Sequence, residues 1–178
     1  STVRLRGLVV MACLTLLQTA AWVGVNASVR SSLLRFESLL DFRFQSPRAA
    51  AIAREEIGGY RRGRNDLEGA ASAYAQCVVL DSTNARRWML LANAAASAGD
   101  TESARPAYQR AVDLGTDDPD AFLNLGILRY NIGDVSGGIQ LVEEAFNRDS
   151  TRVLVPFTIA RMYQDGARDP AAALPWFS

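Results

Sequence analysis

Residues 85–118 read ARRWMLLANAAASAGDTESARPAYQRAVDLGTDD, and residues 119–152 read PDAFLNLGILRYNIGDVSGGIQLVEEAFNRDSTR. A shift of 34 residues relates the two stretches, because Gly99-Asp100 in the first returns as Gly133-Asp134 in the second. A fixed period of this length is typical of stacked helix–turn–helix units and not of one globular core. Stacked arrays usually bind other proteins, so the period by itself favours an interaction protein over an enzyme.

The period divides the chain beyond residue 50 into four units, namely residues 51–84, 85–118, 119–152 and the partial unit 153–178. Small residues stand at the eighth and twentieth positions of every unit: Gly58, Ala92, Gly126 and Ala160, and then Ala70, Ala104, Gly138 and Ala172. Large residues stand at the twenty-fourth position (Tyr74, Tyr108, Val142 and Trp176), and the twenty-seventh is small again (Cys77, Ala111 and Ala145). This pattern resembles the tetratricopeptide repeat and covers residues 51–178.

The resemblance implies a pair of antiparallel helices in each unit, which touch through the small residues at the eighth and twentieth positions. It also implies that the large twenty-fourth residue packs against the following unit and that Cys77 is a buried packing residue. Ser46-Pro47 has the residue types of an N-cap and a first helical position, so we expect the repeat domain to span residues 46–178. The predicted fold is all-α, with a tetratricopeptide-like α-solenoid of helix–turn–helix repeats.

The fourth unit departs from the pattern. Pro156 occupies its fourth position, and the loop residues from Gly166 to Asp169 are shifted. The sequence stops within the second helix of this unit, whereas a solenoid needs a polar cap at its end. We therefore expect that the chain continues or that a partner covers this end.

The chain contains no His and no Lys, and its net charge is zero. Without imidazole it lacks the commonest general base, zinc ligand and haem ligand. Its two cysteines, Cys13 and Cys77, lie in different parts of the chain and match no metal-binding spacing. No nucleophile–base pair and no phosphate-binding loop is recognisable. The sequence thus predicts a protein that is not an enzyme and that has no cofactor, metal or small-molecule substrate.

Charge is divided unevenly along the chain. Residues 1–64 hold ten Arg against four acidic residues, a net charge of +6, and residues 65–178 hold nine Arg against fifteen acidic residues, a net charge of −6. Each cation near an anionic lipid surface gains about 1 kcal/mol, so we expect the basic part to face lipid headgroups. The arginines alternate with apolar residues and belong to no nucleic-acid-binding motif, which argues against a nucleic-acid partner.

Residues 7–29 form a stretch of 23 residues without any charge. As a helix this stretch is roughly 34 Å long, enough to cross a hydrocarbon layer of about 30 Å. It predicts a single transmembrane helix after a short tail, residues 1–6. A cleaved secretory signal is the alternative, and the length of the apolar run favours the uncleaved anchor. Arginine as the only cation indicates a GC-rich bacterial genome, so the predicted location is the inner (cytoplasmic) membrane.

The predicted span carries residues suited to packing against another helix. Gln18 lies at its midpoint, and a carboxamide in a membrane usually faces a neighbouring helix. Ala20, Gly24 and Ser28 form a stripe of small residues that allows close helix approach. The residues expected at the membrane interface are Trp22, Arg30, Arg35, Phe36 and Arg43.

The orientation of the predicted span depends on two opposing signals. A very short basic tail favours export of the repeats, which places them on the periplasmic side. The arginines that follow the span favour the cytoplasmic side, which stays open as the alternative.

Residues 30–45 connect the predicted span to the repeats. Leu33, Phe36, Leu40 and Phe44 recur at the spacing of an amphipathic helix. This connector helix either lies on the membrane surface, or covers the first repeat, or continues the span and packs on a neighbour. The sequence leaves these alternatives open.

The resemblance implies that the first helices of the units line a concave groove. The groove residues expected to contact a partner are Arg62, Arg86, Met89, Asn93, Leu123, Ile127, Tyr130, Asn131, Phe157 and Arg161. Such a mixed surface with an apolar centre suits a protein segment. Relatives that bind a carboxylate terminus use two Asn, which Asn93 and Asn124 match, but the basic positions fall on Met89, Leu154 and Thr158. A C-terminal carboxylate ligand is therefore not expected.

The sequence as a whole predicts a non-catalytic scaffold for protein–protein interaction. Its expected role is that of a single-span accessory subunit that stabilises a larger bacterial membrane complex, with respiratory and photosynthetic assemblies as candidates. Its expected partners are the other subunits of that complex and the lipid bilayer. The alternative is a membrane-anchored adaptor or assembly factor that captures client peptides in the groove.

Overall fold

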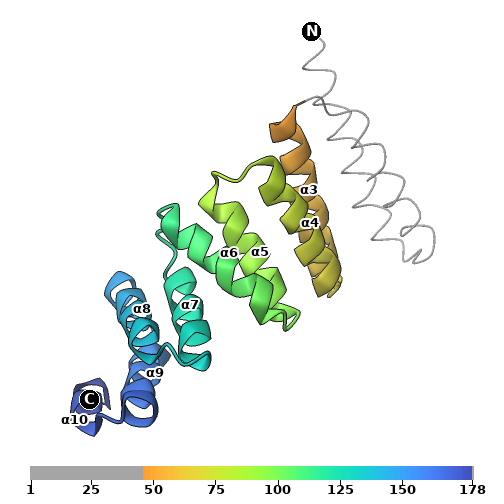
Figure 1. Ribbon diagram of the computed structural model, residues 1–178. Coiled ribbons are helices and arrows are strands. Elements are labelled where there is room, and N and C mark those ends of the chain that lie inside the picture. The colour runs from red at the N-terminus through yellow and green to blue at the C-terminus, as the bar shows by residue number, and fades with distance from the viewer. Residues whose placement is uncertain (1–45, 178) are drawn as a thin grey trace. The chain divides into compact units, whose positions relative to one another are not determined.

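The computed structural model describes residues 46–177, and this part of the chain folds into consecutive helices (Figure 1). The helices are α3 (Pro47–Gly63), α4 (Leu67–Leu80), α5 (Ala85–Ser97), α6 (Thr101–Asp113), α7 (Pro119–Asn131), α8 (Val135–Arg148), α9 (Leu154–Arg161), the π-helix η1 (Met162–Ala167), α10 (Pro170–Ala173) and the 3₁₀-helix η2 (Leu174–Phe177). The predicted tail (1–6), span (7–29) and connector (30–45) lie outside the described residues. Within residues 46–177, no helix combines the length and the apolar character that crossing a membrane requires.

The helices stack in pairs. The most extensive packing joins α3 with α4, α5 with α6 and α7 with α8, and the second helix of each pair then contacts the first helix of the next. Figure 1 shows the pairs following one another along the chain from α3 to α8. The helix–turn–helix solenoid predicted from the period is therefore confirmed.

Small residues bring the two helices of a pair into close contact. A Cβ atom added to Gly126 in α7 would lie 2.8 Å from the carbonyl oxygen of Gly138 in α8, and a Cβ added to Gly138 would lie 2.8 Å from the oxygen of Gly126. In the first pair, Gly58 lies directly under the ring of Tyr74. The predicted contact between the eighth and twentieth positions is confirmed for α7 and α8, whereas in the first pair the eighth position contacts the twenty-fourth.

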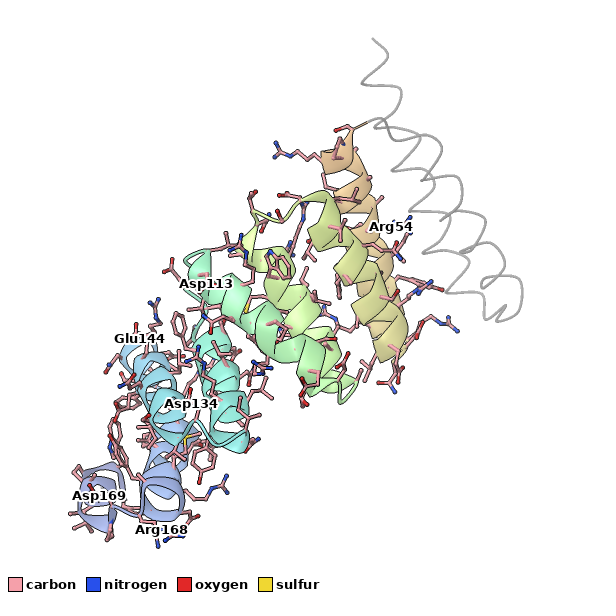
Figure 2. All side chains as sticks on the ribbon, in the orientation of Figure 1. Arg54, Asp113, Asp134, Glu144, Arg168 and Asp169 are labelled. Atoms are coloured by element: carbon pink, nitrogen blue, oxygen red, sulfur yellow. The ribbon has the colours of Figure 1, made fainter. Side chains whose placement is uncertain are left out.

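The turns within the pairs share one backbone conformation. Asn65, Gly99 and Gly133 have φ values of 61°, 81° and 94°, a left-handed region that Gly and Asn adopt at least cost. The Asp that follows each of them caps the second helix, as Asp134 does by accepting a hydrogen bond from the backbone N–H of Gly137 at 3.0 Å (Figure 2). At Asp100, the hydrogen bond from Ser103 lowers the pKa of the carboxyl group.

The fourth unit contains one additional residue. The capping residue there is Asp169, which follows Asp134 by 35 residues instead of 34, and it accepts from the N–H of Ala172 at 3.0 Å. The π-helix η1 absorbs the extra residue, because a π-turn is one residue wider than an α-turn. The close helix contact consequently falls on Ala173, which is buried, and not on Ala172 as the period predicted.

The same shift moves the large residues of the fourth unit. Phe177 now stands where the earlier units have Tyr74, Tyr108 and Val142, yet it is 49% exposed. Trp176, which the period placed there, instead meets Phe146 edge-on with ring centroids 5.4 Å apart.

Within residues 46–177, the apolar core includes two clusters of buried residues. The first is rich in Ala and runs from α4 to α8 around Tyr74, Tyr108 and Leu125. The second gathers apolar residues of α8, α9 and η1 around Val142. Leu123 of α7 packs against both, so the core continues from unit to unit.

Cys77 lies at the small twenty-seventh position and has no solvent exposure. Its Sγ–H group donates a hydrogen bond to the carbonyl oxygen of Ala51 at 3.1 Å. Burial raises the pKa of the thiol to about 11, so it stays protonated at neutral pH. The predicted packing role of this residue is confirmed.

Candidate functional site

An open pocket of about 390 Å³ lies where three consecutive helices meet. Its lining residues are Asn93, Ala96 and Ser97 of α5, Tyr108 of α6, and Asn124, Ile127 and Leu128 of α7. The short side chains of Ala96 and Ser97 leave room, while Ile127 and Leu128 supply an apolar wall. Among residues 46–177, no charged side chain lines the pocket.

A chain of hydrogen bonds crosses this pocket. The hydroxyl group of Tyr108 donates to Oδ1 of Asn93 at 2.6 Å and accepts from Nδ2 of Asn124 at 3.1 Å. We call these three residues the Tyr108 relay. Tyr108 is 1% exposed, and its burial raises the pKa of the phenol. The hydroxyl therefore keeps its proton at neutral pH and holds both amides in place.

Charged side chains at two of the junctions between units are paired with one another. Arg86 and Arg87 both bind the carboxylate of Glu55, and Arg87 also binds Asp81. At the junction between the third and fourth units, Arg152 pairs with Asp120 and, at 3.0 Å, with Asp149. These pairs join the helices of successive units.

A sequence model of the tetratricopeptide repeat matches residues 48–119 and 89–150, more than half of the chain. The chain belongs to the tetratricopeptide repeat family. It is thus a repeat scaffold for protein–protein interaction, from a family that is generally non-catalytic.

Among curated proteins, the BBSome complex member BBS4 of Xenopus tropicalis is 38% identical over 81 residues, which are 44% of this chain and 16% of that protein. The chain therefore spans about a sixth of the length of this relative.

Solved structures of the family resemble the described repeats. The crystal structure of MamA has a TM-score of 0.65 and 23% identity, over 71% of this chain and 74% of that chain. YrrB, described as a TPR protein with an unusual peptide-binding site, has a TM-score of 0.63 and 20% identity over 71% and 65%. The first TPR of Spaghetti (RPAP3), bound to the HSP90 peptide SRMEEVD, has a TM-score of 0.59 and 16% identity over 67% and 94%. At these identities the likeness shows the fold alone.

The tetratricopeptide units bring some of the predicted groove residues together. Asn93 and Ile127 share the pocket. Tyr130 is close to Ile127 in the sequence, but its ring packs against the fourth unit. A Cβ atom added to Gly166 would lie 2.4 Å from the ring of Tyr130. Leu123 is half-buried between the two parts of the core.

The prediction that Met89 contacts a partner is wrong. It is 5% exposed and packs in the first part of the core, so a partner cannot reach it. The other predicted groove residues are exposed: Arg62, Arg86, Asn131, Phe157 and Arg161. Phe157 is 52% exposed, and its ring lies 6.4 Å from that of Phe177.

The family pattern alone missed the central residue of the pocket. Tyr108 was expected to serve as a packing residue at the twenty-fourth position, and its burial agrees with that. The available signal was its hydroxyl group, because a buried Tyr usually finds a hydrogen-bond partner. Ala96, Ser97 and Leu128 of the lining had no signal beyond their place in the helices.

The predicted membrane residues lie outside the described part of the chain and remain predictions. They are Gln18, Ala20, Gly24 and Ser28 for helix packing, and Trp22, Arg30, Arg35, Phe36 and Arg43 for the membrane interface. Among residues 46–177, no group of three or more His, Cys, Asp or Glu is placed to hold a metal ion.

Proposed function

We propose that the repeats hold an extended segment of a partner protein against α5 and α7, with one side chain of that segment in the pocket. The observation that carries this proposal is the uncharged pocket crossed by the Tyr108 relay. A volume of about 390 Å³ with an apolar wall and a few fixed polar groups is typical of binding sites. The structural neighbours YrrB and RPAP3, whose descriptions name peptide binding, support the same reading.

Filling the pocket tests this proposal. Ser97 is exposed and lines the pocket at the end of α5, so Ser97→Arg should obstruct the pocket without disturbing the core. We expect at least a tenfold loss of the partner that co-purifies with the full chain in mild detergent, measured by quantitative mass spectrometry. Ser72→Arg, on an exposed position of α4 away from the pocket, is the matched control. Equal retention of partners by both variants would place the interaction elsewhere.

We also propose that the chain is a single-span accessory subunit of a larger bacterial membrane complex, respiratory or photosynthetic, with its repeats on the periplasmic side. The uncharged stretch 7–29 supports this proposal because it is long enough to span a bilayer. Gln18 and the stripe Ala20, Gly24 and Ser28 support contact with neighbouring helices. The second candidate is an anchored adaptor that captures client segments, and the same pocket favours it.

Replacing the small residues of the stripe with larger ones distinguishes an accessory subunit from an adaptor. If the span packs on other subunits, Ala20→Leu with Gly24→Leu should keep two helices apart and reduce co-purification of the complex about tenfold. Ala12→Leu with Thr15→Leu, in the same stretch but on the opposite face of such a helix, is the control. The wild-type chain should be recovered with its partners in a fixed ratio. A substoichiometric mixture of many proteins that is insensitive to the stripe would favour the adaptor.

A further inference from the structure

We infer that two copies of this chain associate through an exposed apolar surface of the fourth unit. This inference goes beyond the proposed function and does not depend on the pocket, so each can fail without the other. We call the surface the α9–η2 patch. Its residues are Val153, Leu154, Phe157, Leu174 and Phe177, with exposed fractions of 73%, 77%, 52%, 69% and 49%.

The patch is continuous across two helices. Leu154 and Phe157 stand three residues apart in α9, so they share one face of that helix. Leu174 and Phe177 stand three residues apart in η2, where a 3₁₀-helix places such residues one above the other. The two helices pack together, and the rings of Phe157 and Phe177 lie 6.4 Å apart. Figure 1 shows this end of the described chain at α9 and α10, and η2 follows α10 directly.

The fourth unit builds its core without the patch. Val155, Ile159 and Met162 fill the cluster around Val142, and Trp176 packs against that cluster. Within residues 46–177, neither of the two core clusters includes a residue of the patch. The exposed side chains therefore add nothing to the packing of the single copy, and a charge introduced among them should leave the fold intact.

The area of the patch matches what a dimer requires. With ordinary side-chain areas of about 150 to 200 Å², the five residues expose roughly 600 Å² of apolar surface. This is the upper limit for the largest apolar patch of a typical monomer, about 300 to 600 Å². Two such patches in contact would bury about 1,200 Å² before the polar rim is counted, and specific interfaces begin at about this size.

A folded surface suits the patch better than an extended peptide does. The five side chains carry no polar atom, so an extended segment laid on them would lose water from its N–H and C=O groups without gaining hydrogen-bond partners. A helical face has these backbone groups already paired. The α9–η2 patch of a second copy is such a face.

The charges around the patch also favour a second copy. Residues 153–177 hold two Arg and two Asp, all of them exposed: Arg161, Asp165, Arg168 and Asp169. A two-fold contact joins the same surface of both copies, so a rim with equal numbers of cations and anions can pair with itself. An anionic lipid surface would require an excess of cations, which this rim lacks.

The mass of the full chain tests the inference. Sedimentation equilibrium in a non-ionic detergent that is density-matched to the buffer measures the protein without its micelle, and we expect twice the mass of one chain. Phe157→Glu should raise the dissociation constant of the dimer at least about tenfold, because a carboxylate would lose water in an apolar contact. Leu174→Glu, on the other helix of the patch, should have the same effect. Circular dichroism would establish that both variants are folded.

Val79→Glu is the matched control, because Val79 is an apolar residue of α4 that is 84% exposed and lies outside the patch. It should leave the dimer intact, as should Ser97→Arg, which fills the pocket. A mixture of Phe157→Glu and Phe157→Arg chains should associate more tightly than either chain alone, because opposite charges then meet within one interface.

Two results would overturn the inference. One is a wild-type chain that sediments as a monomer. Loss of a co-purifying protein from Phe157→Glu but not from Val79→Glu would then assign the patch to a different partner. The other is a dimer that Phe157→Glu and Leu174→Glu leave as stable as Val79→Glu does. Its dissociation by Ala20→Leu with Gly24→Leu would place the contact in the predicted span.

Discussion

Replacing Arg87 with alanine should lower the free energy of unfolding by about 3 kcal/mol, because the change breaks a buried ion-pair network. Arg87 is 5% exposed, and its guanidinium binds Glu55 of α3 at 3.2 Å as well as Asp81 at the end of α4. One side chain of α5 thus ties together both helices of the preceding unit. Glu55 would keep its bond to Arg86, which places the expected loss at the lower end for buried pairs. The change in the free energy of unfolding is measured by urea unfolding of the full chain in non-ionic detergent, followed by circular dichroism.

An exposed pair provides the control for this prediction. Arg105 lies 3.8 Å from Glu102, and the two side chains are 40% and 83% exposed. Arg105→Ala should change the free energy of unfolding by at most about 0.5 kcal/mol. Adding Asp81→Asn to an Arg87→Met variant should restore part of the stability, because no carboxylate of Asp81 is then left without its partner. An Arg87→Ala effect no larger than that of Arg105→Ala would contradict a structural role for the network.

The helix pairs could be predicted from the sequence because their contacts are periodic. Gly58, Gly126 and Gly138 stand where two helices need closest approach, and a small residue at a fixed spacing is visible without coordinates. The left-handed turn residues Gly99 and Gly133 are equally visible, because few residue types tolerate a positive φ. Sequence periodicity thus records contacts that every unit must make.

Contacts that occur in a single unit could not be predicted from the sequence period. Arg87 is buried although arginine is usually exposed, and only the position of Glu55 and Asp81 across the junction explains it. The extra residue of the fourth unit was visible as shifted loop residues. How the backbone absorbs it, by a π-turn that moves the close contact to Ala173, depends on packing. The Tyr108 relay likewise depends on three helices meeting, which no local pattern encodes.

Replacing Gly138 with alanine should lower the free energy of unfolding by about 2 kcal/mol, even though alanine is the better helix former. The added Cβ would lie 2.8 Å from the carbonyl oxygen of Gly126, 2.9 Å from Cβ of Tyr130 and 3.0 Å from its backbone nitrogen. None of these atoms is the flexible end of a side chain, so α8 can accept the methyl group only by moving away from α7. Urea unfolding of the full chain measures the loss.

Gly59→Ala makes the same chemical change where space is available. Within the described residues, the nearest atom to its Cβ would be the hydroxyl oxygen of Tyr74 at 3.8 Å, an ordinary contact. This variant should therefore stabilise the chain by about 0.5 to 1 kcal/mol, through helix propensity and a less flexible unfolded state. A Gly138→Ala chain as stable as the wild type would show that α7 and α8 do not cross this closely.

The part of the chain that loses stability in Gly138→Ala distinguishes local from cooperative unfolding. In a solenoid each unit contacts its neighbours only, so a fault at the α7–α8 crossing should spread to α9 and η1 before it reaches α3 and α4. Amide hydrogen exchange of Gly138→Ala should therefore accelerate in residues 119–148 while residues 47–80 keep their protection. Uniform acceleration along the described chain would instead mean that the repeats unfold as one cooperative body, and the nearest-neighbour account of their stability would have to be abandoned.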